Sequence, residues 1–296
     1  NNTSVTSMED LSGNGYTATL NNFSLDGSSS AWVSPAGLDF DGGSDYVELP
    51  QGLTDSFNDF TFEAWVYWKG GKHWQRIFDF GSDYNENMFF TPRASGDVIR
   101  FAITTSGALS EQRVSSTDTM PKNQWVHLAL VLDGDSGHIY QDGVKIASNS
   151  ILLNPSALAL SASNWLGKSH YEADLNFFGQ MKDVRIWNTA RTASEIQTNM
   201  NSSLQGTETG LYAFYPFASN SPSDTVLTDQ TGNGRDGMLK NFALDGSSSN
   251  WVSDYPAAIA SWPNCSPYQT EITKPSAGVI SFSNPSLHVE AKVTSQ

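Results

Sequence analysis

The sequence predicts an all-β protein, a sandwich of two antiparallel sheets, and three observations support this. Short segments alternate apolar and polar residues with a period of two, as in FTFEAWVYW at residues 60–68, which is the pattern of a strand with one buried face. Gly, Asn and Asp turns separate such segments roughly every 8 to 12 residues. Only one segment has a convincing helical pattern.

The predicted strands follow one another along the chain, at 60–68, 76–80, 87–91, 97–105, 125–133, 138–148, 180–188 and 210–217. Within 138–148, Asp142-Gly143 is a strong hairpin signal, because the favoured two-residue turn needs positive φ at both central residues. Residues 134–137 form another turn between strands. The one helix is predicted from Thr192 to Met200, where Thr192 and Glu195 form a capping box ahead of Ile196.

Composition excludes several classes of protein. Of the 296 residues, 38% are hydrophobic and 12% are aromatic, which is too many for a disordered chain. No apolar stretch reaches the roughly 18 residues that a membrane-spanning helix needs. The net charge of −15 argues against nucleic acid as a partner, because phosphates attract a basic surface.

The single cysteine, Cys265, excludes an intrachain disulfide framework, and we assign it no role. The first residues have neither the basic nor the apolar segment of a signal peptide. We therefore expect the chain to follow a signal peptide or to lie within a longer polypeptide with further domains.

An internal repeat sets the predicted domain organisation. Residues 10–34 align without gaps on residues 229–253, and 16 of the 25 positions are identical. We predict one domain over 1–204, a partial repeat of its opening over 205–260, and a Pro/Ser-rich segment over 261–296. The partial repeat either begins a second sandwich or docks on the first and covers an edge strand. Docking is favoured because a half-sandwich could not bury its own apolar face.

Seven motifs in series resemble one family. They are DLSGNG, LDFDGGSDYVEL, FTFEAWVYW, WQRIFDFGSDYNENMFF, NQWVHLALVLDGDSGHIYQDGVKIASN, NWLGKSHYEADLNFFGQMKDVRIWN and TASEI. The series covers about residues 5–200 and is similar to the bacterial laminin G-like modules of the concanavalin A-like lectin/glucanase superfamily, distant relatives of the pentraxins. The resemblance implies a jelly-roll sandwich with bound calcium. It also implies a glycan- or polysaccharide-binding part of a glycosidase, lyase or adhesin that is extracellular or at the cell surface.

The candidate calcium ligands are oxygen-bearing side chains in loops: Asp83, Asn85, Glu172, Asp174, Asp41 and Asp45. The first four lie in acidic turns that, by their place in the strand order, resemble the pentraxin loops that hold calcium. Carboxylate and amide oxygens are the ligands that Ca²⁺ prefers. The alternative is that these side chains only shape their own turns by hydrogen bonding to the backbone.

The candidate ligand-binding residues are aromatic or planar polar side chains in loops: Trp74, Arg76, Tyr84, His170 and Tyr171. Sugar sites combine an aromatic ring, on which the CH face packs, with polar groups that bond the hydroxyls. An arginine would add a bidentate donor for the carboxylate or sulfate of an acidic glycan. The tryptophans in or beside strands are expected in the core: Trp65 or Trp68, Trp125, Trp165 and Trp187.

We predict a non-catalytic, calcium-dependent carbohydrate-binding module of a secreted or surface protein. The repeat suggests an alternative, an adhesin or structural segment that binds protein or belongs to a tandem array. A catalytic jelly roll is disfavoured. No Glu-x-Asp-x-x-Glu motif is present and Glu63 stands alone in its strand, whereas a retaining glycosidase needs two carboxylates about 5–5.5 Å apart.

Overall fold

The computed structural model describes residues 7–9, 17–21, 37–158, 161–217, 223–244, 250–252 and 279–282. Contacts divide the chain into two units, Ala36–Val252 and a unit of Asn1–Pro35 with Ser253–Gln296. In the latter, β1 (Ser7–Glu9), β2 (Thr17–Asn21) and β19 (Val279–Phe282) form an antiparallel sheet in the order β1-β2-β19. Cys265 and most of the first repeat copy lie outside the described residues.

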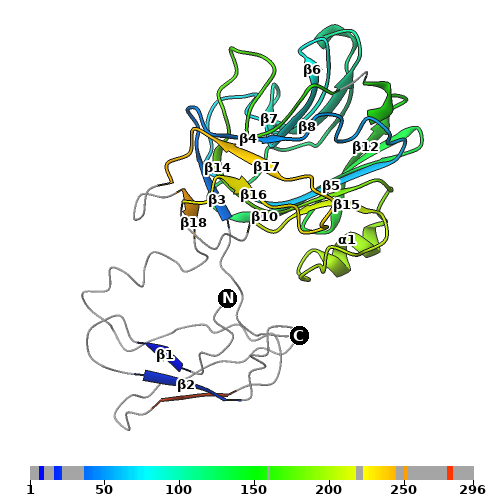
Figure 1. The fold of residues 1–296 in the computed structure, drawn as a ribbon. Helices are drawn as coiled ribbons and strands as arrows, with labels where there is room; N and C mark the ends of the chain where they lie inside the picture. Colours follow the sequence, from blue (N-terminus) through cyan, green and yellow to red (C-terminus); the bar gives the residue numbers. More distant parts are fainter. Residues whose placement is uncertain are drawn as a thin grey trace. The chain divides into compact units, whose positions relative to one another are not determined.

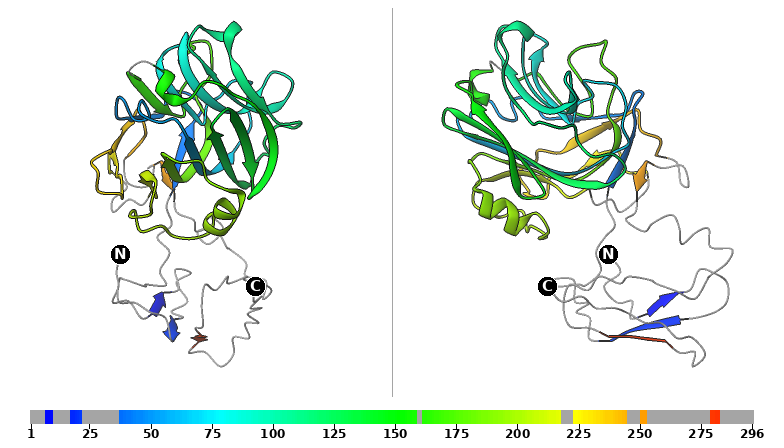
Figure 2. Two further views of the ribbon diagram at one scale, coloured as in Figure 1. Left: turned by 90° about the vertical axis from the view of Figure 1, so that its right-hand side faces the viewer. Right: turned by 180° about the vertical axis from the view of Figure 1, so that it is seen from behind.

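The unit Ala36–Val252 is a jelly-roll sandwich of two eight-stranded sheets (Figures 1 and 2). Sheet I consists of β3 (Gly37–Asp41), β5 (Phe60–Trp68), β10 (Trp125–Asp133), β11 (Ser136–Gln141), β12 (Val144–Ser150), β14 (Phe178–Trp187), β15 (Leu211–Tyr215) and β18 (Trp251–Val252). Its order is β12-β11-β10-β5-β14-β3-β18, with β15 also paired to β14.

Sheet II consists of β4 (Tyr46–Leu49), β6 (Phe78–Asp83), β7 (Glu86–Ala94), β8 (Val98–Thr104), β9 (Gln112–Ser115), β13 (Ser163–Leu166), β16 (Val226–Leu227) and β17 (Gly237–Lys240). Its order is β16-β17-β4-β13-β6-β7-β8-β9. Two short 3₁₀ turns, Ala108–Ser110 and Pro155–Ala157, and one helix, α1 (Ala193–Asn199), complete the described elements of this unit.

The predicted fold class is confirmed, and β5 shows how the sequence produces it. Alternate residues of this strand, from Phe60 to Trp68, point into the core between the sheets, and all five are fully buried. The hairpin between β11 and β12 turns at Asp142 and Gly143, whose φ angles of 49° and 77° match the predicted turn. The capping box of Thr192 and Glu195 at the start of α1 is present.

The second repeat copy supplies strands to both sheets. β17 pairs with β4 and places Leu239 opposite Val47. β18 pairs with β3 and places Trp251 opposite Leu38. The preceding strand, β15, pairs with β14 and puts Tyr215 into the core. The strands within 211–252 therefore belong to this sandwich, while the predicted domain boundaries at 204 and 260 stay predictions.

Part of the face of sheet I that points away from the core is covered by the chain between β14 and β15, including α1 (Figure 1). Ile196 of α1 packs on Ala129, Val131 and Tyr140. Beside this contact lies a second apolar cluster, formed by Trp187, Leu204, Leu211 and Phe214.

Arg185 on β14 ties this covering segment to the sheet. The side chain is buried, and its guanidinium donates two hydrogen bonds of 2.7 Å to the carboxylate of Asp183. It also donates to the carbonyls of Asn199 and Ser202, each at 2.8 Å. Carbonyls at the end of a helix lack partners within the helix, so this arginine satisfies them and holds α1 against the sheet.

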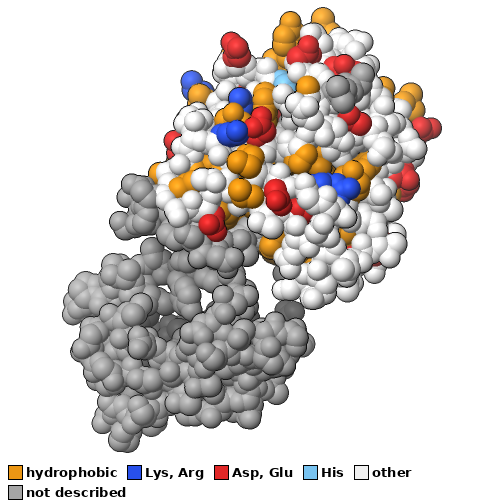
Figure 3. Space-filling model, viewed as in Figure 1, with side chains coloured by type: hydrophobic (Ala, Val, Ile, Leu, Met, Phe, Trp, Pro, Cys, Tyr) orange, Lys and Arg blue, Asp and Glu red, His pale blue; other side chains and the backbone are white. Residues whose placement is uncertain are grey.

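The surface carries mixed charge. On the described part of the face in Figure 3, acidic and basic side chains are scattered among neutral ones, so the net charge of −15 does not gather into one large patch there. No helix among the described residues is long and apolar enough to cross a membrane.

Glu63 is a buried acid beneath the covering segment. Neither of its carboxylate oxygens has a hydrogen-bond partner among the described residues, and His127 Nε2 lies 3.5 Å from Oε2. Burial raises the pKa of Glu63 from 4.5 to about 7, and burial lowers the pKa of His127 from 6.5 to about 3. Both groups are therefore held neutral near pH 6 because the covered face desolvates them.

We predict that Glu63 makes the fold less stable as the pH rises. Its folded pKa lies above its unfolded value, so the stabilisation is complete below pH 4.5 and is lost between pH 4.5 and about 7. His127 has the opposite sign and loses stability as the pH falls from 6.5 towards 3.

The test compares the free energy of unfolding of the wild type and Glu63→Gln from pH 4 to pH 8. His127 is present in both proteins, so its effect largely cancels in the difference. Relative to the wild type, the free energy of unfolding of Glu63→Gln should rise by on the order of 2–3 kcal/mol between pH 4.5 and 7.5. Parallel curves for the two proteins would contradict the prediction.

Candidate functional site

The five predicted ligand residues gather on the face of sheet II that points away from the core. On β6, Phe78 and Phe80 face the core, so Asp79 between them points outward. Asp79 lies opposite Phe89 of β7, between the inward residues Met88 and Phe90. The loops 70–76, 83–86 and 169–175 bring the predicted residues to this outward face.

Arg76 is the centre of a buried polar network. Its Nε donates to Asp79 Oδ2 at 3.3 Å, its Nη2 lies 3.0 Å from Asp174 Oδ2, and its Nη1 donates to the carbonyl of Trp74. The guanidinium also packs on the ring of Phe89, with 4.0 Å from Cζ to the ring centre. Arg76 was predicted as a donor for ligand, and in this structure its side chain is 2% exposed and engaged by the protein itself.

His170 also belongs to this network, through Asp79. Its Nδ1 lies 2.8 Å from Asp79 Oδ1, and its backbone N–H donates to Asp79 Oδ2 at 3.1 Å. Burial raises the pKa of Asp174, whereas Arg76 and the hydroxyl of Ser169, which donates to Asp174 at 2.9 Å, oppose this rise. The loop 169–175 is thus fixed to β6 through two carboxylates.

Tyr84 and Tyr171 form an aromatic pair at the surface. Their ring centres are 5.9 Å apart, and the Tyr171 hydroxyl donates to the carbonyl of Tyr84 at 3.1 Å. Tyr84 is 54% exposed, and Tyr171 is half-buried. Burial and the nearby Glu111 raise the pKa of Tyr171. The pair presents apolar ring surface to solvent from a fixed position.

Trp74 borders the same network in an unusual backbone conformation. Its φ is 73°, in the left-handed region that a tryptophan rarely adopts. Its N–H donates to the carbonyl of Arg93 at 2.8 Å, and its own carbonyl accepts from Arg76. The indole lies 5.4 Å from the guanidinium of Arg100. Hydrogen bonds at both its backbone N–H and its carbonyl therefore hold this strained residue in place.

Sequence reasoning missed a neighbouring aromatic group. Trp165, expected in the core, is half-buried on the outward face and stacks on His170 with 4.4 Å between ring centres. Lys168 Nζ lies 4.2 Å from the ring centres of both Trp165 and Tyr46. The alternation along β13 could have shown this: Leu166 points inward, so its neighbour Trp165 points outward. Among the other tryptophans, Trp68 and Trp187 are fully buried, and Trp65 and Trp125 are half-buried.

The predicted metal ligands do not converge. Asp83 Oδ1 accepts from the N–H groups of Asn85 (2.7 Å) and Glu86 (3.2 Å). Asp41 Oδ1 likewise accepts from the amides of its own turn. No three His, Cys, Asp or Glu side chains come together as a metal site in the described part of the chain.

Of the remaining predicted ligands, Asp45 lies beside Asp41 and Asp39, whereas Glu172 and Asp174 belong to the loop 169–175. Asp45 is buried and accepts from the Asp41 N–H at 3.1 Å, and burial raises its pKa to about 6. Glu172 is exposed to solvent, and Asp174 pairs with Arg76. This donor set does not fit Ca²⁺, which needs six to eight oxygens around one point. Calcium binding stays a prediction.

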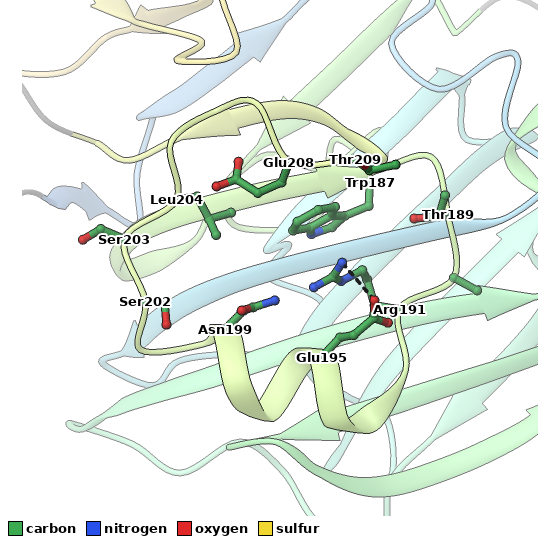
Figure 4. Close-up of a pocket in the computed structure, with 11 residues that line it drawn as sticks. Trp187, Thr189, Arg191, Glu195, Asn199, Ser202, Ser203, Leu204, Glu208 and Thr209 are labelled. Carbon is green, nitrogen blue, oxygen red and sulfur yellow. Dashed lines mark ion pairs between the residues drawn. The ribbon is translucent and has the colours of Figure 1, made fainter.

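A separate cavity of about 560 Å³ lies beside α1, on the covered side of sheet I (Figure 4). Arg191 stacks on Trp187 there, with 4.0 Å from Cζ to the ring centre, and pairs with Glu195 at 3.3 Å. Glu195 also serves the capping box, and Glu208 accepts from two backbone amides of its own loop. The charged groups of this cavity are engaged with one another or with the backbone, and no predicted ligand residue lines it.

A laminin G family model, described as the concanavalin A-like lectin/glucanases superfamily, matches residues 41–197. No curated protein sequence matches the chain. One similar solved structure is a Bacteroides ovatus protein provisionally assigned as carbohydrate-binding. Its TM-score is 0.55 at 21% identity, and the match covers 72% of this chain and 60% of that one.

A second similar structure is domain 4 of an extracellular arabinanase from Geobacillus stearothermophilus, in complex with arabinotriose. Its TM-score is 0.49 at 22% identity, with 64% of this chain and 90% of that domain covered. Of the two likenesses, the first supports the jelly-roll fold, and this chain spans 60% of the length of that protein.

Asp79 and Asp83 provide a matched test of the network. Asp79→Ala leaves the buried Arg76 and His170 without their shared acceptor, so we expect a loss of about 3–5 kcal/mol in the free energy of unfolding. Asp83→Ala removes two hydrogen bonds of an exposed turn and should cost about 1 kcal/mol. Urea denaturation measures both values, and equal losses would show that the Asp79 network does not hold the loop.

Proposed function

The chain belongs to the concanavalin A-like lectin/glucanase superfamily, and from this premise we propose that it is a non-catalytic carbohydrate-binding module of a secreted or cell-surface protein. The partner would be a glycan or polysaccharide that binds on the outward face of sheet II. The location outside the cell is part of the same proposal.

The observation that carries the proposal is the surface pair of exposed Tyr84 and half-buried Tyr171 beside fixed polar groups. The rings offer a surface for the CH face of a sugar. Glu111, whose charge acts on Tyr171, and Glu172 supply carboxylate oxygens for hydroxyl groups in the same region. Because the network of Arg76 and Asp79 fixes the loop that carries Tyr171, the surface is organised before ligand arrives, which lowers the entropy cost of binding.

The arrangement of acids supports a non-catalytic role. The carboxyl with a pKa of about 7, Glu63, would suit a general acid, yet it is fully buried beneath the segment between β14 and β15. Asp79, at the centre of the candidate site, is also buried and is bonded to Arg76 and His170. Neither carboxylate is open to a glycosidic bond.

Affinity electrophoresis in gels that contain a panel of polysaccharides tests the proposal. We expect at least one polysaccharide to retard the wild type. Tyr84→Ala should weaken that binding about 10- to 100-fold, because it removes a ring that ligand would cover. Its melting temperature should stay close to that of the wild type, since the side chain is exposed.

The matched control is Tyr67→Ala, which changes a half-buried tyrosine on the outward face of sheet I. It should leave glycan binding unchanged. Retardation no greater than background with every polysaccharide would contradict the proposal, as would equal effects of the two variants. Release of reducing ends or unsaturated products from any bound polysaccharide would contradict the non-catalytic part.

A further inference from the structure

We propose that the guanidinium of Arg76 takes the place of a divalent metal ion between β6 and the loop 169–175. It balances the charges of Asp79 and Asp174 and fixes the loop, so that this part of the site needs no calcium. The family resemblance implies calcium near this loop, and the geometry of the donors disagrees with it. The charge balance and the loop position at this place do not depend on whether a glycan binds.

The charges require a cation at this place. Asp79 is fully buried and Asp174 is 15% exposed at its side chain, and each carboxylate raises the energy of the other when both are ionised. Arg76 lies between them, with Nε 3.3 Å from Asp79 Oδ2 and Nη2 3.0 Å from Asp174 Oδ2. A guanidinium keeps its charge at every physiological pH and can bond two acceptors at once.

Three oxygens of the two carboxylates, Asp79 Oδ1 and Oδ2 and Asp174 Oδ2, already face N–H or O–H groups. Asp79 accepts from Arg76 Nε and the His170 backbone N–H at Oδ2, and Oδ1 lies 2.8 Å from His170 Nδ1. Asp174 Oδ2 accepts from the Ser169 hydroxyl in addition to Arg76. A calcium ion would need these oxygens at about 2.3–2.6 Å, and the donors that now occupy them would have to leave.

An aromatic ring and a backbone carbonyl also fix the position of the Arg76 side chain. Its guanidinium packs on the Phe89 ring at 4.0 Å, and Nη1 donates to the carbonyl of the strained Trp74. The loop it fixes carries Tyr171, whose carbonyl accepts from the Asp174 N–H at 3.0 Å. The position of the Tyr171 ring therefore depends on an arginine of the chain rather than on the supply of an ion.

The first test is thermal unfolding of the full chain in about 5 mM EDTA and in about 5 mM CaCl₂, where a bound structural ion would add a stabilisation that grows with its concentration. We expect the two melting temperatures of the wild type to agree within about 1 °C. Asp174→Asn should show the same flat response, because it removes a carboxylate that binds no ion in the wild type.

The second test is Arg76→Ala, which leaves two facing carboxylates without their cation. We expect its melting temperature in EDTA to fall by about 5 °C or more and to recover partly in calcium, since the freed oxygens become available to a hard cation. The double variant Arg76→Ala/Asp174→Asn should lose the calcium response. Arg76→Lys keeps one charge without the planar fork and should gain no calcium response.

Several results decide the matter. A wild-type melting temperature that falls by several degrees in EDTA, with the effect abolished in Asp174→Asn, would overturn the proposal. So would an Arg76→Ala protein that folds and gains no calcium response. A calcium effect that persists in Asp174→Asn and disappears in Asp45→Asn would place an ion in the loop 39–45 and leave Arg76 as the cation here. Where Arg76→Ala does not fold, the comparison of wild type with Asp174→Asn decides.

Discussion

The sandwich depends on β5, a central strand with both faces covered. Its inward residues, such as Phe62 and Val66, fill the core, while Glu63 and Trp65 point to the other side. Trp65 donates its indole N–H to the Met200 carbonyl at 2.9 Å. Since an apolar or half-apolar face cannot stay open to water at no cost, the segment between β14 and β15 must lie over sheet I, and the outward face of sheet II is left for loops that can meet a ligand.

On the outward face of each sheet, one buried arginine joins a covering segment or loop to the sheet. Arg185 joins the end of α1 to sheet I through carbonyls and Asp183, and Arg76 joins the loop 169–175 to sheet II through Asp79 and Asp174. Each guanidinium has several donors in one plane, so one side chain can bond partners from separate segments. Neither arrangement contributes an open charge to the surface.

The strands were predictable because alternation of residues fixes which face is buried, and the capping box of α1 is local in sequence. The approach of the loops 83–86 and 169–175 follows from sheet order, which no local pattern encodes; here the family resemblance supplied it. The function of single acids was not predictable. Asp83 and Asp41 have the residue type of a metal ligand and of a turn former alike, and only the direction of the carboxylate, towards its own backbone, separates the two. Arg76 lies beside the other predicted ligand residues, but its bonds to Asp79 and to Asp174, which is distant in sequence, have no local signature.

The pairing of β17 with β4 means that one edge of sheet II is closed by a segment made much later during synthesis. At about 5–20 residues per second, residues 46–49 wait roughly 10–40 seconds for residues 237–240 to emerge from the ribosome. In that interval the edge of β4, with Val47 and Leu49 on its inward side, has unpaired backbone groups that can recruit other chains. Once residues 237–240 are made, the pairing of β17 with β4 removes these open backbone groups.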